Sequence, residues 1–147
     1  DFVREILNEA NDINYCLQVD LDHSYLPFRK NFFDYITCMD VLEHLILPRR
    51  LLQEINRVLK PGGNCLLSVP NIQFIEYILS FIKGKVPLPA SDPRHMSIYT
   101  IKHLKKELTN SNFSITFLQG CDASPKLFSH LSKRFLCKTI VMEGKKL

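Results

Sequence analysis

Three side chains that can bind a metal or move a proton lie within five positions of one another. Asp40, Glu43 and His44 are spaced i, i+3 and i+4, so a helical turn that starts at Asp40 would place all three on one side. Carboxylate oxygens and an imidazole nitrogen grouped in this way suit a divalent cation such as Mg²⁺, Mn²⁺ or Zn²⁺. The spacing therefore makes this segment a candidate metal site.

Alternating strands and helices must position these residues. Residues 32–39 are almost continuously apolar, aromatic or β-branched, which is typical of a strand covered on both faces of a parallel sheet. Cys65–Val69 predicts a second buried strand. Between them, the apolar residues of Leu51–Lys60 follow helical spacing, and Pro61, Gly62 and Gly63 are expected to stop that helix.

The same alternation extends to both sides of this segment and predicts one α/β domain. The further expected elements are a helix over 1–11, a strand over Tyr15–Val19, a helix over Ile72–Ile82, a Pro-containing loop over 84–93, a helix capped by Thr100 that runs to about Thr109, strands over Phe113–Leu118 and Leu136–Met142, and a partly helical connection over 122–134. Strands that alternate with helices predict a doubly wound parallel sheet with helices on both faces.

Composition narrows the class of protein. The formal charge of +4 over 147 residues is mild and evenly scattered, so a nucleic-acid partner is not expected. Five cysteines form an odd number without a C-x-x-C spacing, which favours buried reduced thiols and a cytoplasmic location. No apolar stretch reaches the roughly 18–20 residues of a membrane-spanning helix.

Longer motifs at the ends of the strands resemble the class I S-adenosylmethionine-dependent methyltransferases. They are QVDLDHSYLPF (18–28), FDYITCMDVLEHL (33–45), LLQEINRVLKPGGNCLLSVPN (51–71) and RHMSIYTIKHLKKEL (94–108). The resemblance covers residues 1 to about 120 and is greatest to the branch that includes the ubiquinone-pathway O-methyltransferases. It implies a Rossmann-like sheet in the strand order three, two, one, four, five, seven, six, with an antiparallel strand near the C-terminus.

The resemblance also implies the cofactor, S-adenosylmethionine, and the residues that hold it. Asp20 would accept a hydrogen bond from the adenine amine, and Leu21 would pack on the ring. Cys38, Met39 and Asp40 match the segment whose backbone lines the methionine moiety and the sulfonium. The expected reaction is methyl transfer to a small apolar molecule, with oxygen favoured over nitrogen or carbon as the acceptor atom.

His44, Glu43 and His95 are the candidate catalytic residues under this resemblance. His95 matches a further metal ligand of small-RNA 2′-O-methyltransferases and a comparable histidine of the ubiquinone-pathway enzymes. A cation held by Asp40, Glu43, His44 and His95 would lower the pKa of a substrate hydroxyl. Many similar proteins carry this Leu-Glu-His motif with no recognised metal, so two other roles stay open: His44 as a general base or substrate orienter, and the pair as a structural cap.

Two features of the family pattern are absent from the sequence. The N-terminal glycine-rich motif is missing, since Gly62 and Gly63 are the first glycines. The acidic residue that holds the ribose is missing too, unless Asp1 takes that role instead of starting a helix. Strands one and two are not found, so residues 1–147 are expected to be the C-terminal two-thirds of one domain that begins upstream, and the activity of the chain on its own stays open. Either the Tyr15–Val19 strand is displaced, or upstream residues fill the gap beside it.

The predicted helix Ile72–Ile82 has only a narrow polar strip, formed by Gln73, Glu76, Ser80 and Lys83. Its apolar remainder fits a substrate wall, a peripheral membrane contact, a homodimer face or simple burial. Two other functions also stay open. One is a catalytically silent methyltransferase-like subunit that acts through this helix, and the other is an RNA 2′-O-methyltransferase, against which the lack of a basic aromatic face counts.

Overall fold

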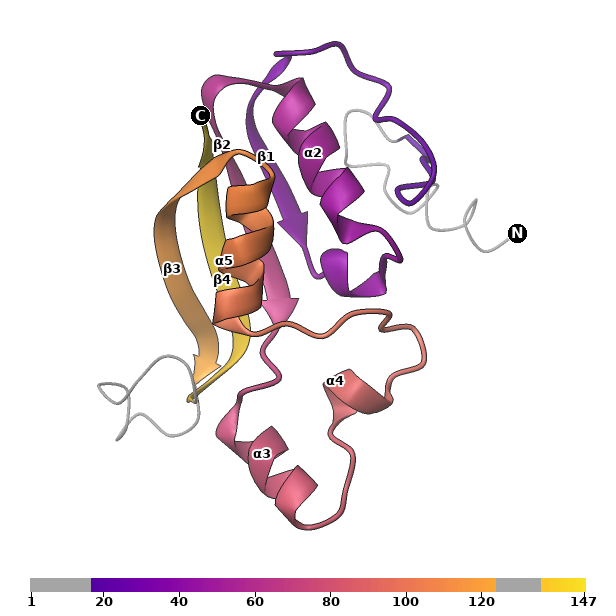
Figure 1. The fold of residues 1–147 in the computed structure, drawn as a ribbon, viewed down its shortest axis with the longest axis vertical. Helices are drawn as coiled ribbons and strands as arrows, with labels where there is room; N and C mark the ends of the chain where they lie inside the picture. Colours follow the sequence, from indigo (N-terminus) through magenta and orange to yellow (C-terminus); the bar gives the residue numbers. More distant parts are fainter. Residues whose placement is uncertain (1–16, 124–135) are drawn as a thin grey trace.

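Two helices pack against one face of a four-stranded sheet in the computed structural model, which describes residues 17–123 and 136–147 (Figure 1). The strands are β1 (Phe33–Met39), β2 (Leu59–Pro70), β3 (Phe113–Ala123) and β4 (Cys137–Lys146). The helices are the 3₁₀ turn η1 (Leu42–His44), α2 (Pro48–Val58), α3 (Ile75–Ile82), α4 (Leu88–Ser91) and α5 (Ile101–Asn110).

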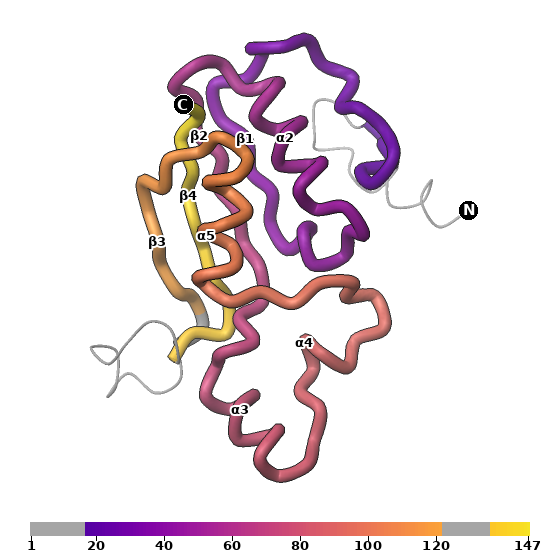
Figure 2. Tube along the Cα trace, in the orientation of Figure 1, coloured from indigo at the N-terminus to yellow at the C-terminus, as the bar shows by residue number. Residues whose placement is uncertain are grey.

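The sheet has the strand order β1-β2-β4-β3. β1 and β2 are parallel, and β4 runs antiparallel to both β2 and β3. This order confirms positions four, five, seven and six of the expected sheet, including its antiparallel strand near the C-terminus. Among the described residues, helices cover one face only: α2 and α5 lie on it, whereas α3 and α4 lie beyond the end of the sheet (Figures 1 and 2).

One hydrophobic core fills the space between the sheet and these two helices. Every second residue of β2 points into it, and α2 and α5 contribute residues at helical spacing. Its fully buried aliphatic members include Leu52, Leu59, Leu67, Leu104, Leu108, Ile140 and Met142. Each buried side chain of this size stabilises the fold by about 1.5–3 kcal/mol relative to exposure. This core therefore fixes the positions of the strand ends that carry the candidate site residues.

Short-range signals predicted several elements correctly. α5 begins after Thr100, whose Oγ1 accepts the backbone N–H of His103 at 3.1 Å. α2 starts earlier than expected and ends at Val58, because β2 begins immediately after it. A side chain at Gly63 would place Cβ 2.9 Å from the Asp34 carbonyl oxygen, so glycine here lets β2 approach the start of β1.

Three expectations about secondary structure do not hold in the described part of the chain. The loop expected over 84–93 contains the four-residue helix α4. Residues 17–19 form no strand, so the strand expected over Tyr15–Val19 is wrong for its three described residues. Residues 15 and 16, and the helix expected over 1–11, lie outside the described residues. α3 starts at Ile75 and not at Ile72. The reason is Asn71, whose N–H donates to the Lys138 carbonyl at 2.7 Å and whose Oδ1 accepts the Gln73 N–H.

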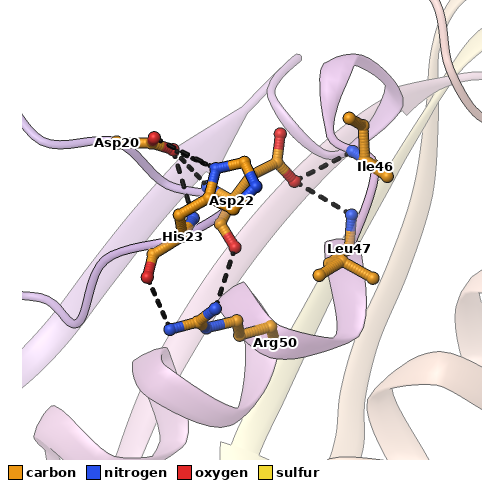
Figure 3. Close-up of polar contacts among 6 residues, drawn as sticks. All are labelled: Asp20, Asp22, His23, Ile46, Leu47 and Arg50. Carbon is orange, nitrogen blue, oxygen red and sulfur yellow. Dashed lines mark hydrogen bonds and ion pairs between the residues drawn. The ribbon is translucent and has the colours of Figure 1, made fainter.

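Polar contacts anchor the segment before β1 to the corner between η1 and α2 (Figure 3). Asp22 Oδ1 accepts the backbone N–H groups of Ile46 and Leu47, both at 2.9 Å. Arg50 donates to the carbonyl oxygens of Asp22 and His23 at 3.2 and 2.6 Å. These bonds join positions more than twenty residues apart and hold residues 22 and 23 beside the corner between η1 and α2. No helix among the described residues is long and apolar enough to cross a membrane.

Asp22 therefore fixes the backbone directly before α2, and its removal should destabilise the fold. We expect Asp22→Ala to lower the free energy of unfolding by about 1–2 kcal/mol, since two backbone donors lose their acceptor. Urea unfolding measures this loss. Asp22→Asn keeps the accepting oxygen and should stay close to the original chain, as should Asp34→Ala, which removes an aspartate whose side chain is 81% exposed. Equal destabilisation by Asp22→Asn and Asp22→Ala would contradict the role of Asp22 Oδ1 as the acceptor for these two N–H groups.

Candidate functional site

The carboxyl ends of β1 and β2 meet at one edge of the sheet, which is where open α/β sheets bind ligands. Asp40 follows β1 directly and has a φ of 50°, a left-handed conformation that is unfavourable for a residue with a side chain. Its N–H donates to the carbonyl and the hydroxyl oxygens of Ser68 at 3.1 and 3.0 Å, and the Ser68 hydroxyl donates to Asp40 Oδ1 at 2.8 Å. These bonds hold Asp40 against β2.

The helical turn that was expected to start at Asp40 is therefore not formed. Helical structure begins only at Leu42, as the short 3₁₀ turn η1. A left-handed residue cannot be the first residue of a right-handed turn, so the i, i+3, i+4 spacing does not bring Asp40 to the side of Glu43 and His44. The expectation that these three residues project together from one helix is wrong.

The structure instead brings Glu43, His44 and His95 together. One nitrogen or carboxylate oxygen from each of them lies within 4.8 Å of the others, and the ring centroids of the two histidines are 4.9 Å apart. The Glu43 carbonyl oxygen accepts the N–H groups of Met96 and Ser97 at 2.7 and 3.1 Å. This backbone contact seats the loop before α5 on η1 and so places His95 beside His44.

Both histidines use Nδ1 for a contact with a backbone carbonyl oxygen. Nδ1 of His44 lies 3.1 Å from the Arg94 carbonyl oxygen, and Nδ1 of His95 lies 2.9 Å from the Pro89 carbonyl oxygen. A carbonyl oxygen can only accept, so Nδ1 carries the proton in each ring and Nε2 of the neutral ring keeps a lone pair. Metal-binding histidines are oriented by such contacts, and a general base needs the same free Nε2.

Glu43 is the buried member of the group. It is 2% exposed, and its Oε2 has no hydrogen-bond partner among the described residues. Burial raises the pKa of Glu43 above its ordinary value, and the negative charge of Asp40 acts in the same direction, whereas His44 and His95 act against it. An unpaired buried carboxylate oxygen is unfavourable. A bound cation or a hydroxyl donor would supply the partner that Glu43 Oε2 lacks.

These donors fit a divalent cation as a three-residue set. Two imidazole Nε2 atoms and a carboxylate oxygen are suitable ligands for a transition metal, and both rings have the supporting carbonyl contacts. Asp40 is not among the three residues whose ligand atoms lie within 4.8 Å of one another, and its Oδ1 accepts a hydrogen bond from the Ser68 hydroxyl; its role as a fourth ligand stays a prediction. The role of Glu43 and His44 as a structural, hydrogen-bonding pair stays open, because His44 Nδ1 and the Glu43 carbonyl oxygen both contact the loop before α5.

A cavity of about 310 Å³ adjoins the cluster at the same edge of the sheet. It is lined by residues from the ends of β1 and β2, from β4, and from the α3–α4 segment: Asp40, Pro70, Tyr77, Leu88, Pro89, Asp92, His95, Lys138 and Thr139. His95 belongs both to the cavity wall and to the cluster. The cavity is therefore the space in which a small molecule could meet the histidine pair.

The structure places the expected cofactor residues in three different surroundings. Asp20 is exposed; its Oδ1 accepts the N–H groups of Asp22 and His23, and its Oδ2 pairs with the His23 ring at 3.1 Å (Figure 3). Leu21 packs against the core, and Met39 is 46% exposed. The Cys38 thiol is buried, and this burial raises its pKa to about 12, so the thiol is protonated and shielded from a ligand.

Several residues that shape the site had no signal in the sequence. Ser68 is brought to Asp40 by the β1–β2 register, in which Met39 faces Ser68. Tyr77, Asp92 and Lys138 reach the cavity from three separate segments. Asp22 and Arg50 lie 28 positions apart, and their contact comes from the packing of the loop on α2. Only the polar turn at Asp22 gave a local hint.

Comparison with known proteins identifies the family of this chain. Residues 4–117 match the family model of a methyltransferase domain. The chain is 24% identical over 120 residues to the mitochondrial ubiquinone biosynthesis O-methyltransferase of Dictyostelium discoideum, a match that covers 80% of this chain and 37% of that protein. It is 35% identical over 71 residues to the ubiquinone biosynthesis O-methyltransferase of Coxiella burnetii, a match that covers 48% of this chain and 29% of that protein. The chain thus spans about a third of the length of these curated relatives.

The fold is also found among solved structures. An S-adenosylmethionine-dependent methyltransferase from Mesorhizobium loti superposes with a TM-score of 0.64 at 16% identity, over 97% of this chain and 76% of that chain. Likeness at this level of identity concerns the fold, whereas the family model matches more than half of the sequence. On both grounds, the chain belongs to the class I S-adenosylmethionine-dependent methyltransferases.

Proposed function

We propose that the protein transfers a methyl group from S-adenosylmethionine to an oxygen atom of a small molecule. One observation carries the choice of oxygen: the group formed by Glu43, His44 and His95 adjoins the cavity at the carboxyl edge of the sheet, through His95. Bases and metal ligands beside the acceptor are needed when a hydroxyl must lose its proton. The ubiquinone biosynthesis enzymes among the relatives are named O-methyltransferases, which supports the same choice.

The cofactor would lie across the ends of β1 and the preceding loop. S-adenosylmethionine supplies a methyl group that its positively charged sulfur has already activated. Asp20 would accept from the adenine amine, because its contacts with His23 lower its pKa and keep it charged. Leu21, the Cys38 backbone, Met39 and Asp40 would complete the site. The bonds of Asp40 to Ser68 hold it in place, which supports a positioning role.

The histidine pair would act on the acceptor. S-adenosylmethionine would supply the methyl group to the acceptor oxygen and leave as the neutral thioether, and Nε2 of His44 or His95 would take the hydroxyl proton of the acceptor. Glu43 faces the developing imidazolium and stabilises it. A divalent cation held by these three residues would serve the same end by lowering the pKa of the acceptor hydroxyl.

The walls of the cavity favour an apolar acceptor. Tyr77 reaches it from α3, Leu88 and Pro89 from α4, and Pro70 from the end of β2. This part of the wall would bind an aromatic or aliphatic body, whereas Asp40, Asp92, His95, Lys138 and Thr139 make the rest of the wall polar. We further propose that the chain forms the C-terminal two-thirds of its domain. The position of β1 at the edge of the described sheet supports this proposal. The cytoplasmic location stays a prediction.

Loss of either histidine should impair transfer without impairing cofactor binding. In the full-length product that contains this chain, we expect His44→Ala and His95→Ala to lower kcat at least 100-fold, while calorimetry finds the affinity for S-adenosylhomocysteine within about twofold. Transfer of a labelled methyl group to a panel of catechols and phenols measures the rate.

His103→Ala is the matched control, because this exposed histidine lies on α5 outside the cluster. Full activity of both His44→Ala and His95→Ala would refute the catalytic role. Absence of any S-adenosylhomocysteine binding by the unaltered protein would instead favour a silent subunit.

The buried carboxylate predicts a pH dependence of stability. Because the pKa of Glu43 is raised above the ordinary 4.5, the folded chain holds this proton more tightly than the unfolded chain. Its contribution to stability is complete below the ordinary pKa and is lost as the pH rises through the raised value. In the presence of a chelator, Glu43→Gln should therefore be about 1–2 kcal/mol more stable than the original chain at pH 8, and the gap should close towards pH 4.

Urea unfolding at a series of pH values measures this gap, and Asp34→Asn, an exposed aspartate, should show none. Addition of Zn²⁺ or Mn²⁺ without chelator should raise the melting temperature of the original chain and leave Glu43→Gln unchanged. An equal response of the two chains would exclude Glu43 as a metal ligand. A pH-independent gap would show that Glu43 stays charged in its buried position.

A further inference from the structure

Helix α3 is apolar but unburied. Six of its eight residues are apolar, and none of the eight is buried. Phe74, directly before it, is 1% exposed and anchors the start of the helix in the protein. A helix with this composition normally faces a core, so the apolar surface of α3 lacks the partner that its sequence suggests.

Five exposed apolar side chains gather where α3 turns towards α4. We call residues 79–88 the α3–α4 turn. Its exposed apolar members are Leu79, Phe81, Ile82, Val86 and Leu88, with exposed fractions from 45 to 77%. Figures 1 and 2 show that this turn projects from the end of the molecule, beyond the sheet and away from α2. A cluster of this kind on a projecting turn marks an interaction surface.

The backbone of the turn is already organised. The N–H of Lys83 donates to the Leu79 carbonyl, that of Gly84 to the Phe81 carbonyl, and that of Lys85 to the Ser80 carbonyl, at 2.9–3.1 Å. Gly84 has a φ of 70°, so these bonds form a Schellman cap that ends α3. The apolar side chains are therefore displayed by a formed helix end, which lowers the entropic cost of binding.

Charge distinguishes between the partners that could cover this surface. Lys83 and Lys85 stand among the apolar residues and are exposed, and no acidic residue occurs between Glu76 and Asp92. Asp92 itself is neutralised by a two-bond pairing with Arg94. In a twofold dimer the same turn of each copy would meet, and the lysines would face one another. A membrane with anionic headgroups complements both the apolar side chains and the lysines.

We propose that the α3–α4 turn docks on an anionic lipid bilayer, with Phe81, Ile82 and Val86 entering the interface and Lys83 and Lys85 binding headgroups. Leu88 is 77% exposed and also lines the cavity that contains His95, so docking brings the cavity mouth to the lipid. The docking does not depend on the proposed reaction. Its consequence for the acceptor does: a lipophilic molecule could enter the site from the bilayer.

Vesicle co-sedimentation of the full chain tests the docking. Vesicles of phosphatidylcholine with about a third phosphatidylglycerol should bind the chain, and vesicles of phosphatidylcholine alone should bind it at least tenfold more weakly. Lys83→Gln/Lys85→Gln should weaken binding to anionic vesicles about 25-fold, at about fivefold per lysine. Phe81→Ser/Ile82→Ser should weaken it at least tenfold, and 0.5 M NaCl should weaken binding of the original chain.

Matched variants control for charge and for hydrophobicity elsewhere. Lys102→Gln/Lys105→Gln removes two exposed lysines of α5, and Ile98→Ser replaces a 51% exposed apolar residue outside the turn; both should bind within twofold of the original chain. Circular dichroism and urea unfolding show that each variant is folded, which keeps this test separate from that of the reaction.

Three results would overturn the proposal. They are equal binding to neutral and anionic vesicles, equal loss of binding in the control variants, and a dimer in analytical ultracentrifugation that Phe81→Ser/Ile82→Ser dissociates while vesicles bind neither form. The last result would identify a second copy of the chain as the partner of the turn.

Discussion

The hydrogen bonds between Asp40 and Ser68 tie the end of β1 to β2, and the arrangement of the site follows from them. They hold Asp40 in a left-handed conformation that would otherwise be unfavourable. That conformation turns the chain out of the sheet and into η1. η1 then presents the Glu43 carbonyl oxygen, which accepts two N–H groups of the loop that carries His95. One pair of neighbouring strands therefore determines where residues 43, 44 and 95 lie.

The buried carboxylate of Glu43 is the unfavourable feature of this arrangement. Its Oε2 has no hydrogen-bond partner among the residues that the structure describes. Polar groups left in this state inside a folded chain reduce its stability, and sites that bind ligands are where proteins tolerate such a cost. The two histidines make the site more specific, because each is fixed by a carbonyl contact that leaves Nε2 directed to a ligand or a proton.

The molecule has a densely packed layer and a less buried segment at the edge of the sheet. The sheet, α2 and α5 share one core, whereas α3 and α4 extend beyond it and contribute side chains to the cavity. Packing density keeps the first part in a single arrangement. The second part has few buried residues, which suits a segment that covers an apolar acceptor and meets a surface outside the protein.

Local patterns in the sequence were sufficient for the elements and for the family. The strands β1 and β2, the amphipathic helix α2 and the Thr100 cap of α5 depend on contacts between residues a few positions apart, so their spacing predicts them. The expected burial of β1 on both faces does not hold in the described structure, since Cys38 is its only buried residue. The motifs that follow the strands identified the methyltransferase class for the same reason. Glu43, His44 and His95 could be chosen as candidates, since their side chains are those that chemistry requires.

Tertiary structure decided the rest, because the deciding contacts join distant residues. Local spacing placed Asp40 on a helical turn, but a hydroxyl 28 positions away holds it against β2. The Tyr15–Val19 segment has strand-forming residues, yet residues 17–19 form no strand, since a strand also requires a neighbour with free backbone groups. The apolar pattern of α3 left burial and exposure equally open. Only the folded chain shows that its apolar side chains stay outside the core, because β2 ends and Asn71 directs the chain away before α3 begins.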